Sequence, residues 1–266
     1  MQLGVHKNSA KVLGYGFVKT NEKLIKDGVI TQIDATAELV DSLLANKLVG
    51  KLSTNRVVMS IPVSHVFTRV LTLPRMSKKE LATAVELEVE QSVPLAPKDL
   101  YFDYEVSDAE DSEQNLVRMV AAPRKIVDSY MGVCELLKLN LCLIQTNIDA
   151  DARLCMLYED INDGNPYIIL DVGGNSMDVG VIDTTLRVTG TVDVGGENLT
   201  AAIASAMGIS KANAQSIKVK RGLNAGEGQA KIQKAVHPLL DKVVDEIKRI
   251  KKFYHDRVRQ DVDVSQ

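Results

Sequence analysis

The chain has 266 residues, of which 45% are hydrophobic and 25% charged, which is enough material for two lobes with separate cores. A formal charge of -3 gives no general attraction for phosphodiester backbones or anionic lipid surfaces, so nucleic acid is not expected as a partner. The three cysteines, Cys134, Cys142 and Cys155, lie in apolar runs, which is typical of buried, reduced thiols in the cytoplasm. No stretch approaches the roughly 20 apolar residues of a membrane-spanning helix, so direct membrane insertion is not expected.

The start of the chain predicts strands followed by a helix. Lys11 to Val18 and Val29 to Ile33 are apolar and β-branched runs between glycine-containing breaks, and we predict a small antiparallel sheet. From Asp34 to Val49, apolar residues recur at helical spacing, which indicates an amphipathic helix with Asp34 as its N-cap. The apolar run Val57 to Ile61 is expected to form a strand buried on both faces. This pattern indicates an α/β fold.

The next stretch has an order of its own, which predicts an inserted α+β subdomain. Its predicted elements are a strand from Phe67 to Leu73, a helix from Ser77 to Ser92, strands from Leu100 to Val106 and from Leu116 to Ala122, and a helix from Arg124 to Leu139. Ser77 and Glu80 have the spacing of a capping box. In the second strand, Leu100, Phe102, Tyr104 and Val106 are expected to pack, while Tyr101, Asp103 and Glu105 share the solvent side.

A second lobe is predicted beyond the turn-rich segment Asn162 to Pro166. Its predicted strands are Tyr167 to Asp171, Met177 to Asp183 and Leu186 to Val194, and its predicted helices are Leu199 to Met207, Lys211 to Arg221 and about Lys231 to His255. The last helix carries one sustained apolar stripe, so we expect it to pack across the sheet of this lobe.

The segment Asp171 to Ser176, which includes Asn175, lies between two predicted strands and is a candidate phosphate loop. Gly173 and Gly174 permit a tight turn whose N–H groups can point toward phosphate oxygens. Asp171 could order a water bound to Mg²⁺, and the Ser176 hydroxyl could donate to a phosphate. A purely structural hairpin turn explains the same residues equally well, so that alternative stays open.

A second glycine pair, Gly195 and Gly196, precedes a predicted helix, where free N–H groups also favour an anion. The alternative is a strand-to-helix turn with Asn198 as the cap. A dinucleotide fingerprint and a P-loop are both excluded, because the first pair precedes a strand and no Gly-Lys-Ser/Thr follows. Scattered histidines and the absence of a Cys-x-x-Cys give no support for a transition-metal site, and no acyl-transfer motif is present.

The segments DVGGNSMDVGVID, VDVGGENLTAAIASAMGIS and AQSIKVKRGL, in this order, are similar to the second lobe of the actin-like ATPases. In the first half, LGYGFVKTNEKLIKDGVI, NRVVMSIPVSHVFTRVLTLP and ELATAVELEVEQSVPLAPKDLYFDYEV resemble the PilM family of type IV pilus assembly proteins, which is related to FtsA. The resemblance covers nearly the whole chain. It implies an α/β, actin-like (ribonuclease H-like) two-lobed ATPase fold: residues 1–67 and 140–159 as the first lobe, 68–139 as the inserted subdomain, and 160–266 as the second lobe.

The resemblance also implies ATP and Mg²⁺ bound between the lobes. The phosphate loop then corresponds to Asp171–Ser176, with Gly195 and Gly196 nearby, and the helix contacts to Gln215 and Lys218. At Gln215 the relatives often carry glutamate. The family's first phosphate loop, of the type Asp-Ile-Gly-x-x-x-x-Lys, and its Gly-rich adenosine turn are not found in this sequence. We therefore expect an incomplete fold at both ends, weak or no ATP binding, and at most a weak ATPase.

The function implied by the resemblance is a cytoplasmic scaffold of type IV pilus or type II secretion assembly. It would bind the cytoplasmic N-terminal peptide of a PilN-type inner-membrane protein, between the first lobe and the inserted subdomain, and stay peripheral to the membrane through its partners. Other pilus assembly ATPases are further candidate partners. We expect the peptide groove to involve Val57 to Ile61, Phe67 to Leu73 and Val85 to Val93. The alternatives are an FtsA-like division protein and a sugar-kinase-like enzyme of the same superfamily.

Overall fold

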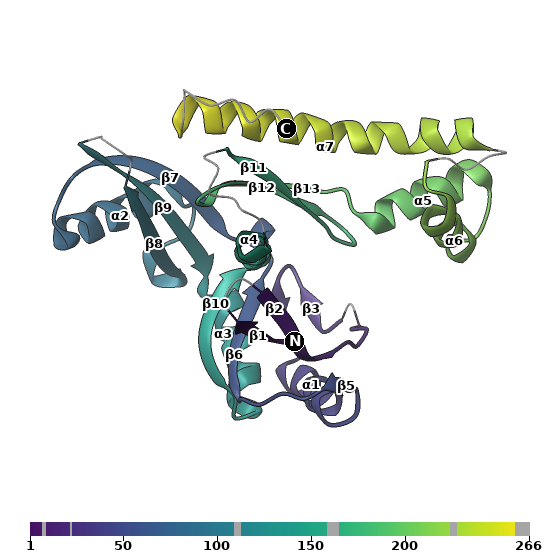
Figure 1. Ribbon diagram of the computed structural model, residues 1–266, viewed down its shortest axis with the longest axis horizontal. Helices are drawn as coiled ribbons and strands as arrows, with labels where there is room; N and C mark the ends of the chain where they lie inside the picture. Colours follow the sequence, from purple (N-terminus) through teal and green to yellow (C-terminus); the bar gives the residue numbers. More distant parts are fainter. Residues whose placement is uncertain (7–8, 22, 109–112, 159–164, 224–227, 259–266) are drawn as a thin grey trace. The chain divides into compact units, whose positions relative to one another are not determined.

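The computed structural model of the protein describes residues 1–6, 9–21, 23–108, 113–158, 165–223 and 228–258 (Figure 1). The chain forms two compact units, residues 1–160 and 161–266. No helix within the described ranges is both long and apolar enough to span a membrane.

The first unit contains several small sheets. Strands β1 (Gln2–His6), β2 (Ser9–Gly16) and β5 (Leu48–Gly50) form an antiparallel sheet in the order β1-β2-β5, and β3 (Ile25–Lys26) pairs with β4 (Val29–Ile30). The predicted small antiparallel sheet is present, but its strands differ: residues 11–16 pair with β1 and β5, whereas residues 29–30 pair with β3. The cause is the turn between β3 and β4, where Asp27 and Gly28 adopt positive φ values of 50° and 76° and fold β4 back onto its own neighbour.

Helix α1 (Ile33–Asn46) begins one residue before the predicted start, with Gln32 rather than Asp34 at the N-cap. Asp34 lies in the first turn instead, where a carboxylate interacts favourably with the helix dipole. Strand β6 (Arg56–Ile61) pairs in parallel with β10 (Asn140–Thr146) in a two-stranded sheet. The expectation that β6 is buried on both faces is wrong, because its burial alternates and Val58 is 54% exposed.

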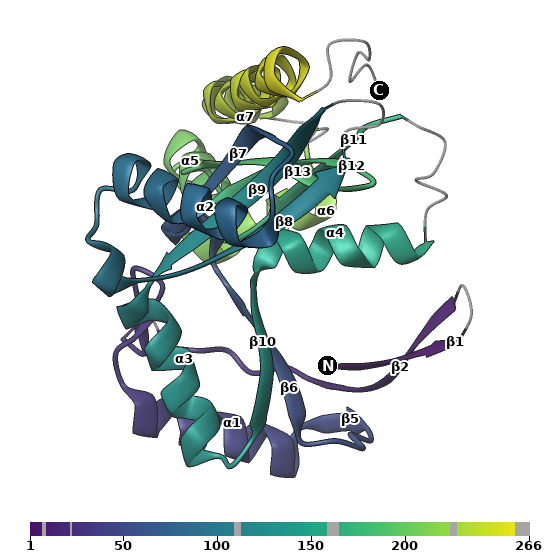
Figure 2. The same ribbon diagram turned by 90° about the vertical axis from the view of Figure 1, so that its left-hand side faces the viewer.

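A further three-stranded sheet of the first unit has the order β7-β9-β8, from strands β7 (Phe67–Pro74), β9 (Gln114–Pro123) and β8 (Leu100–Asp108). Helix α2 (Lys78–Ser92) covers one face of it, and Figure 2 shows this arrangement. The shared core contains Leu71, Leu81, Val85, Val89, Val93, Leu100, Val117, Met119 and Ala121. The Ser77–Glu80 capping box is confirmed: the Glu80 amide donates to Ser77 Oγ (3.4 Å) and the Ser77 amide to Glu80 Oε2 (2.8 Å).

The predicted packed side of β8 is only partly buried. Leu100 lies in the core and Tyr104 packs against it, but Phe102 and Val106 are exposed. Strand β8 lies at the edge of the sheet, where it has a neighbouring strand on one side only.

Helix α3 (Arg124–Leu136) follows β9 and packs against α1 and β4 rather than against the sheet core under α2. It ends three residues before the predicted Leu139, because Lys138 adopts a left-handed conformation (φ 52°) and the Leu139 amide bonds back to the Cys134 carbonyl. Helix α4 (Asn147–Tyr158) then completes the first unit.

The cysteines of the first unit differ in exposure, which corrects the expectation that all three are buried. Cys134 is buried, Cys155 is half-buried and Cys142 is exposed on β10. Burial raises the pKa of the Cys134 thiol, so this side chain stays protonated and unreactive.

The second unit is an antiparallel meander of β11 (Tyr167–Val172), β12 (Met177–Asp183) and β13 (Thr185–Val192), with helices α5 (Gly196–Met207), α6 (Lys211–Arg221) and α7 (Gln229–Arg257). Helix α7 runs along the sheet and on to α5, as Figure 1 shows, so its predicted packing across the sheet is confirmed. Its buried residues are Ile232, Val236, Val243, Ile250 and Tyr254, whereas Val244 is 45% exposed. The Tyr254 hydroxyl donates to buried Asp183 at 2.6 Å.

Candidate functional site

Two features of the structure are candidate sites, one in each unit. The first is the pair of glycine turns in the second unit, which the sequence predicts. The hairpin turn between β11 and β12 closes through the Gly173 amide, which donates to the Ser176 carbonyl at 3.0 Å. The start of α5 lies against this turn: the Gly196 amide donates to the Gly173 carbonyl (2.9 Å) and the Glu197 amide to the Gly174 carbonyl (2.8 Å). The two glycine pairs therefore form one cluster.

Gly195 is the tightest position in the cluster. A Cβ atom there would collide with the Gly174 carbonyl group, so only glycine permits this approach. Gly195 is also the N-cap of α5, and its amide donates to Asn198 Oδ1 at 2.8 Å. Asn198 is thus not the cap but reaches back from the first turn, and the helix starts three residues before the predicted Leu199.

Helix α6 brings Gln215 and Lys218 to the same cluster. Lys218 Nζ donates to the Gly196 carbonyl at 2.6 Å, and Gln215 Oε1 lies 2.8 Å from the Thr200 hydroxyl. Asp171 lies near the end of β11, paired in register with Asp178. All nine predicted residues therefore come from neighbouring positions of one unit.

The chemistry of this cluster suits an anion only in part. The amides of Gly173, Gly195 and Gly196, which the sequence offers for phosphate, donate to protein acceptors instead. Within the described residues, the Gly174 and Asn175 amides at the tip of the turn have no such bond, and the Lys218 ammonium supplies a positive charge nearby. The described part of the chain contains no group of three or more His, Cys, Asp or Glu that could hold a metal ion directly. A nucleotide role for these residues, with water-mediated Mg²⁺ at Asp171, stays a prediction.

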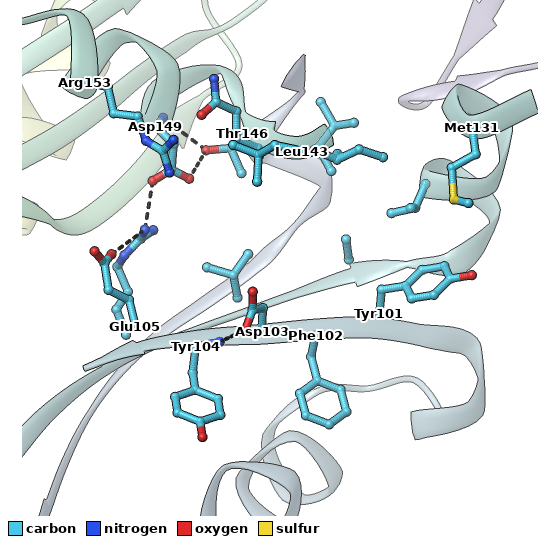
Figure 3. A pocket seen from close by; sticks show the side chains of 17 residues that line it. Tyr101, Phe102, Asp103, Tyr104, Glu105, Met131, Leu143, Thr146, Asp149 and Arg153 are labelled. Carbon is cyan, nitrogen blue, oxygen red and sulfur yellow. Dashed lines mark hydrogen bonds and ion pairs between the residues drawn. The ribbon is translucent and has the colours of Figure 1, made fainter. Parts of the chain in front are cut away.

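The second candidate is a pocket of about 430 Å³ in the first unit (Figure 3). One wall is the face of the β7-β9-β8 sheet that α2 does not cover, with residues from β8 and β9. The opposite wall comes from the end of β6, from α3, from β10 and from α4. The lining residues include Ile61, Tyr101, Phe102, Asp103, Tyr104, Glu105, Arg118, Met131, Leu143, Gln145, Thr146, Asp149 and Arg153.

One end of the pocket is charged. Arg118 Nη2 on β9 lies 2.9 Å from Asp149 Oδ1 on α4 and 3.3 Å from Glu105 Oε2 on β8. The Arg118 and Asp149 side chains are only 15% and 12% exposed, and Thr146 donates its hydroxyl to the other Asp149 oxygen at 2.7 Å. Arg118 Nε and Nη1 and Gln145 Oε1 are buried and have no hydrogen-bond partner among the described residues. The Arg118–Asp149 ion pair therefore joins the two walls.

The other end of the pocket is aromatic and apolar. The Tyr101 hydroxyl on β8 donates to Asp128 Oδ1 on α3 at 3.1 Å, and the Arg124 guanidinium lies 4.0 Å from the centre of the Tyr101 ring. Met131 of α3 and Leu143 of β10 are apolar residues of the opposite wall, and Figure 3 shows Met131 on the side of Tyr101 and Leu143 between Met131 and Thr146. Polarity thus changes along the pocket, from apolar beside Tyr101 to charged beside Glu105.

The sequence locates this pocket only in part. The predicted solvent side of β8, with Tyr101, Asp103 and Glu105, is one of its walls. Of the three segments expected to form a groove, only Ile61 lines the pocket. Val85, Val89 and Val93 are buried in the core under α2, on the other face of the sheet, so these three side chains do not line a groove. The α4 wall is missed, although the i, i+4 spacing of Asp149 and Arg153 is visible in the sequence.

The described fold has solved counterparts of the actin-like class. A structure described as the PilM-PilN type IV pilus biogenesis complex has a TM-score of 0.75 at 20% identity, over 96% of this chain and 74% of the other. MreB5 of Spiroplasma citri, solved with AMPPNP, has a TM-score of 0.51 at 13% identity, over 90% of this chain and 65% of that protein. The chain therefore has an actin-like fold, as the sequence predicts.

The family assignment comes from the sequence match. The model of the type IV pilus assembly protein PilM family matches residues 2–265, so the chain belongs to the PilM family. A shorter match links it to the type II secretion system protein L of Xanthomonas campestris pv. campestris, 31% identical over 75 residues. That match spans 28% of this chain and 20% of the relative.

Proposed function

We propose that this chain is a scaffold of type IV pilus or type II secretion assembly that binds an extended peptide in the pocket of its first unit. The peptide is the cytoplasmic N-terminal segment of a PilN-type inner-membrane protein, which would hold the scaffold at the membrane. The PilM family and the solved PilM–PilN relative support a partner of this type. They also favour it over the division-protein and sugar-kinase alternatives.

The observation that carries this proposal is the run of consecutive residues along the pocket. Residues 101–105 of β8 and 143–146 of β10 all line it, although side chains of a strand alternate between two faces. Figure 3 shows Phe102 and Tyr104 pointing away from the pocket, opposite to Asp103 and Glu105. The backbone itself must then form part of the wall.

Both strands have one edge that pairs with no other described strand, since β8 ends the order β7-β9-β8 and β10 pairs only with β6. An extended peptide can bond to such backbone groups while its side chains enter pockets on alternate sides. The polar backbone and the apolar end together suit an extended peptide better than a compact small molecule.

Fluorescence anisotropy with a labelled peptide tests the proposal, using the first 15 or so residues of the PilN-type protein of the same organism. Leu143→Glu places a charge in the apolar end and should weaken binding roughly tenfold or more. Val12→Glu is the matched control, because Val12 is an exposed apolar residue on β2, a strand that does not line the pocket. Circular dichroism checks that both variants fold. Equal affinity of the two variants, or no binding by the parent chain, contradicts the proposal.

We further propose that the glycine cluster of the second unit binds the phosphates of a nucleotide. The supporting observation is the Lys218 ammonium, held by the Gly196 carbonyl beside the open Gly174 and Asn175 amides. Here the chain would orient phosphates with amides and one cation, and a bound Mg²⁺ would neutralise charge on the phosphate oxygens. In calorimetric titration with Mg-ATP, Lys218→Met should lower the affinity by roughly tenfold or more, whereas Lys220→Met on the exposed side of α6 should not.

A further inference from the structure

The charges along the pocket wall specify the peptide further, and this inference rests on the proposed function. Five charged residues line the pocket: Asp103, Glu105, Arg118, Asp149 and Arg153. Arg118 pairs with both Asp149 and Glu105, and its pair with Asp149 is the more buried of the two. With three carboxylates against two guanidinium groups, the pocket wall is acidic on balance, and Asp103 and Glu105 on its β8 side are both exposed.

Asp103 and Glu105 are placed to share one cation. They lie two residues apart on the same face of β8, so their Cα atoms are about 7 Å apart. A lysine ammonium or an arginine guanidinium between them can contact both carboxylates. Asp103 uses Oδ1 to accept the Tyr104 amide at 2.9 Å, and the Glu105 side chain is 54% exposed next to Arg118.

We propose that the pocket selects an extended peptide that carries a Lys or Arg two or four residues from an apolar side chain. The basic side chain pairs with Asp103 and Glu105, and the apolar one enters the end formed by Tyr101, Met131 and Leu143. The spacing follows from β8 itself: Tyr101, Asp103 and Glu105 lie on one face at two-residue intervals, and an extended peptide presents alternate side chains at the same interval.

Charge complementarity favours this occupant over an acidic or neutral peptide. Cytoplasmic segments next to membrane-spanning helices of bacterial inner-membrane proteins are enriched in Lys and Arg. An acidic pocket wall attracts such segments and speeds the encounter, an effect that weakens as salt increases. Arg153, on the α4 wall, would repel a basic side chain placed there and so directs it toward β8.

The experiment measures peptide affinity after charges are removed from either partner: the Asp103 and Glu105 carboxylates in the whole chain, or single basic side chains in the peptide. The probe is the labelled 15-residue peptide of the PilN-type protein, with and without each Lys or Arg replaced by Gln. Asp103→Asn and Glu105→Gln together should lower the affinity for the parent peptide roughly five- to tenfold at low salt and flatten its salt dependence. Glu90→Gln, which removes one exposed charge from α2 outside the pocket, should leave the peptide affinity and its salt dependence unchanged.

A double-mutant cycle separates the pairing of the basic peptide side chain with Asp103 and Glu105 from losses of affinity that do not depend on this pairing. For one basic peptide position, the Gln peptide should bind the parent chain roughly five- to tenfold more weakly but bind the Asp103→Asn, Glu105→Gln variant with little further loss. The inference is overturned if the parent chain binds the peptide while the neutral variant keeps its affinity and salt dependence, and the proposed function then survives. If the parent chain binds no peptide, this inference and the proposed function both fail.

Discussion

Arg118 connects three elements of the first unit. It extends from β9, pairs with Asp149 of α4 across the pocket and reaches Glu105 of β8 with the same nitrogen. Because Arg118 and Asp149 are nearly buried, each needs the other: removing one partner leaves a desolvated charge, whereas replacing both with apolar residues can be nearly neutral.

Arg118→Met should therefore destabilise the first unit by about 3 kcal/mol, and Arg118→Met with Asp149→Leu should cost clearly less than the sum of the two single changes. Urea unfolding followed by circular dichroism measures these differences. The outcome that contradicts a structural pairing is strict additivity of the two changes.

The glycine cluster shows what a sequence can and cannot predict at the level of residues. The motif around Gly173 and Gly174 is visible, and so is the second pair at Gly195 and Gly196. The hydrogen bond from the Gly196 amide to the Gly173 carbonyl is not visible, because it depends on how α5 packs against the hairpin. Three amides assigned to a ligand are consequently used within the protein.

At the level of elements, local signals predict the chain best. Helix α2 is correctly predicted because a capping box and a regular apolar stripe coincide, and α6 and β12 match their predicted bounds. Strands β1, β3 and β5 are not predicted, since they are short, and β3 and β5 are largely exposed. Strand β10 is missed for a different reason: its partner β6 lies some 80 residues earlier, and no local pattern encodes that pairing.

The Ser77–Glu80 capping box offers a test of one such local signal. Ser77→Ala removes the acceptor for the Glu80 amide and should destabilise the protein by about 1 kcal/mol in thermal or urea unfolding. Thr83→Ala, further along the same exposed face of α2, is the control and should be neutral or slightly stabilising, since alanine has the higher helix propensity.

The same capping box predicts a pH dependence. Hydrogen bonds from Ser77 lower the pKa of the Glu80 carboxyl. A carboxyl whose pKa is lower in the folded state stabilises the protein above its ordinary pKa, and this contribution is lost as the pH falls through the lowered value. The difference in stability between the parent chain and Ser77→Ala should hence shrink under acidic conditions. A difference that stays constant as the pH falls argues against the charged form of Glu80 as the cause.

At the level of the whole molecule, the two candidate sites belong to different units. All residues that line the pocket lie between Ile61 and Arg153, and the glycine cluster lies between Asp171 and Lys218. Each unit has hydrophobic clusters of its own. We expect peptide binding and the integrity of the glycine cluster to be separable by mutation.

Gly195→Val tests this separation, because its side chain would collide with the Gly174 carbonyl and disrupt only the second unit. Peptide affinity by anisotropy should stay within roughly twofold of the parent, while the thermal transition of the second unit should move to lower temperature. Loss of peptide binding without loss of folding in the first unit contradicts independent sites.

Because Met131 lies in the pocket wall, a tryptophan in its place would report peptide binding through its fluorescence. The chain contains no tryptophan, so Met131→Trp would introduce a single indole among Tyr101, Leu143 and the solvent of the pocket. An indole is apolar over most of its surface but keeps one N–H donor, and its emission depends on the polarity around it. A peptide that fills the apolar end would displace water from the indole and shift this emission to shorter wavelength, without any label on either partner.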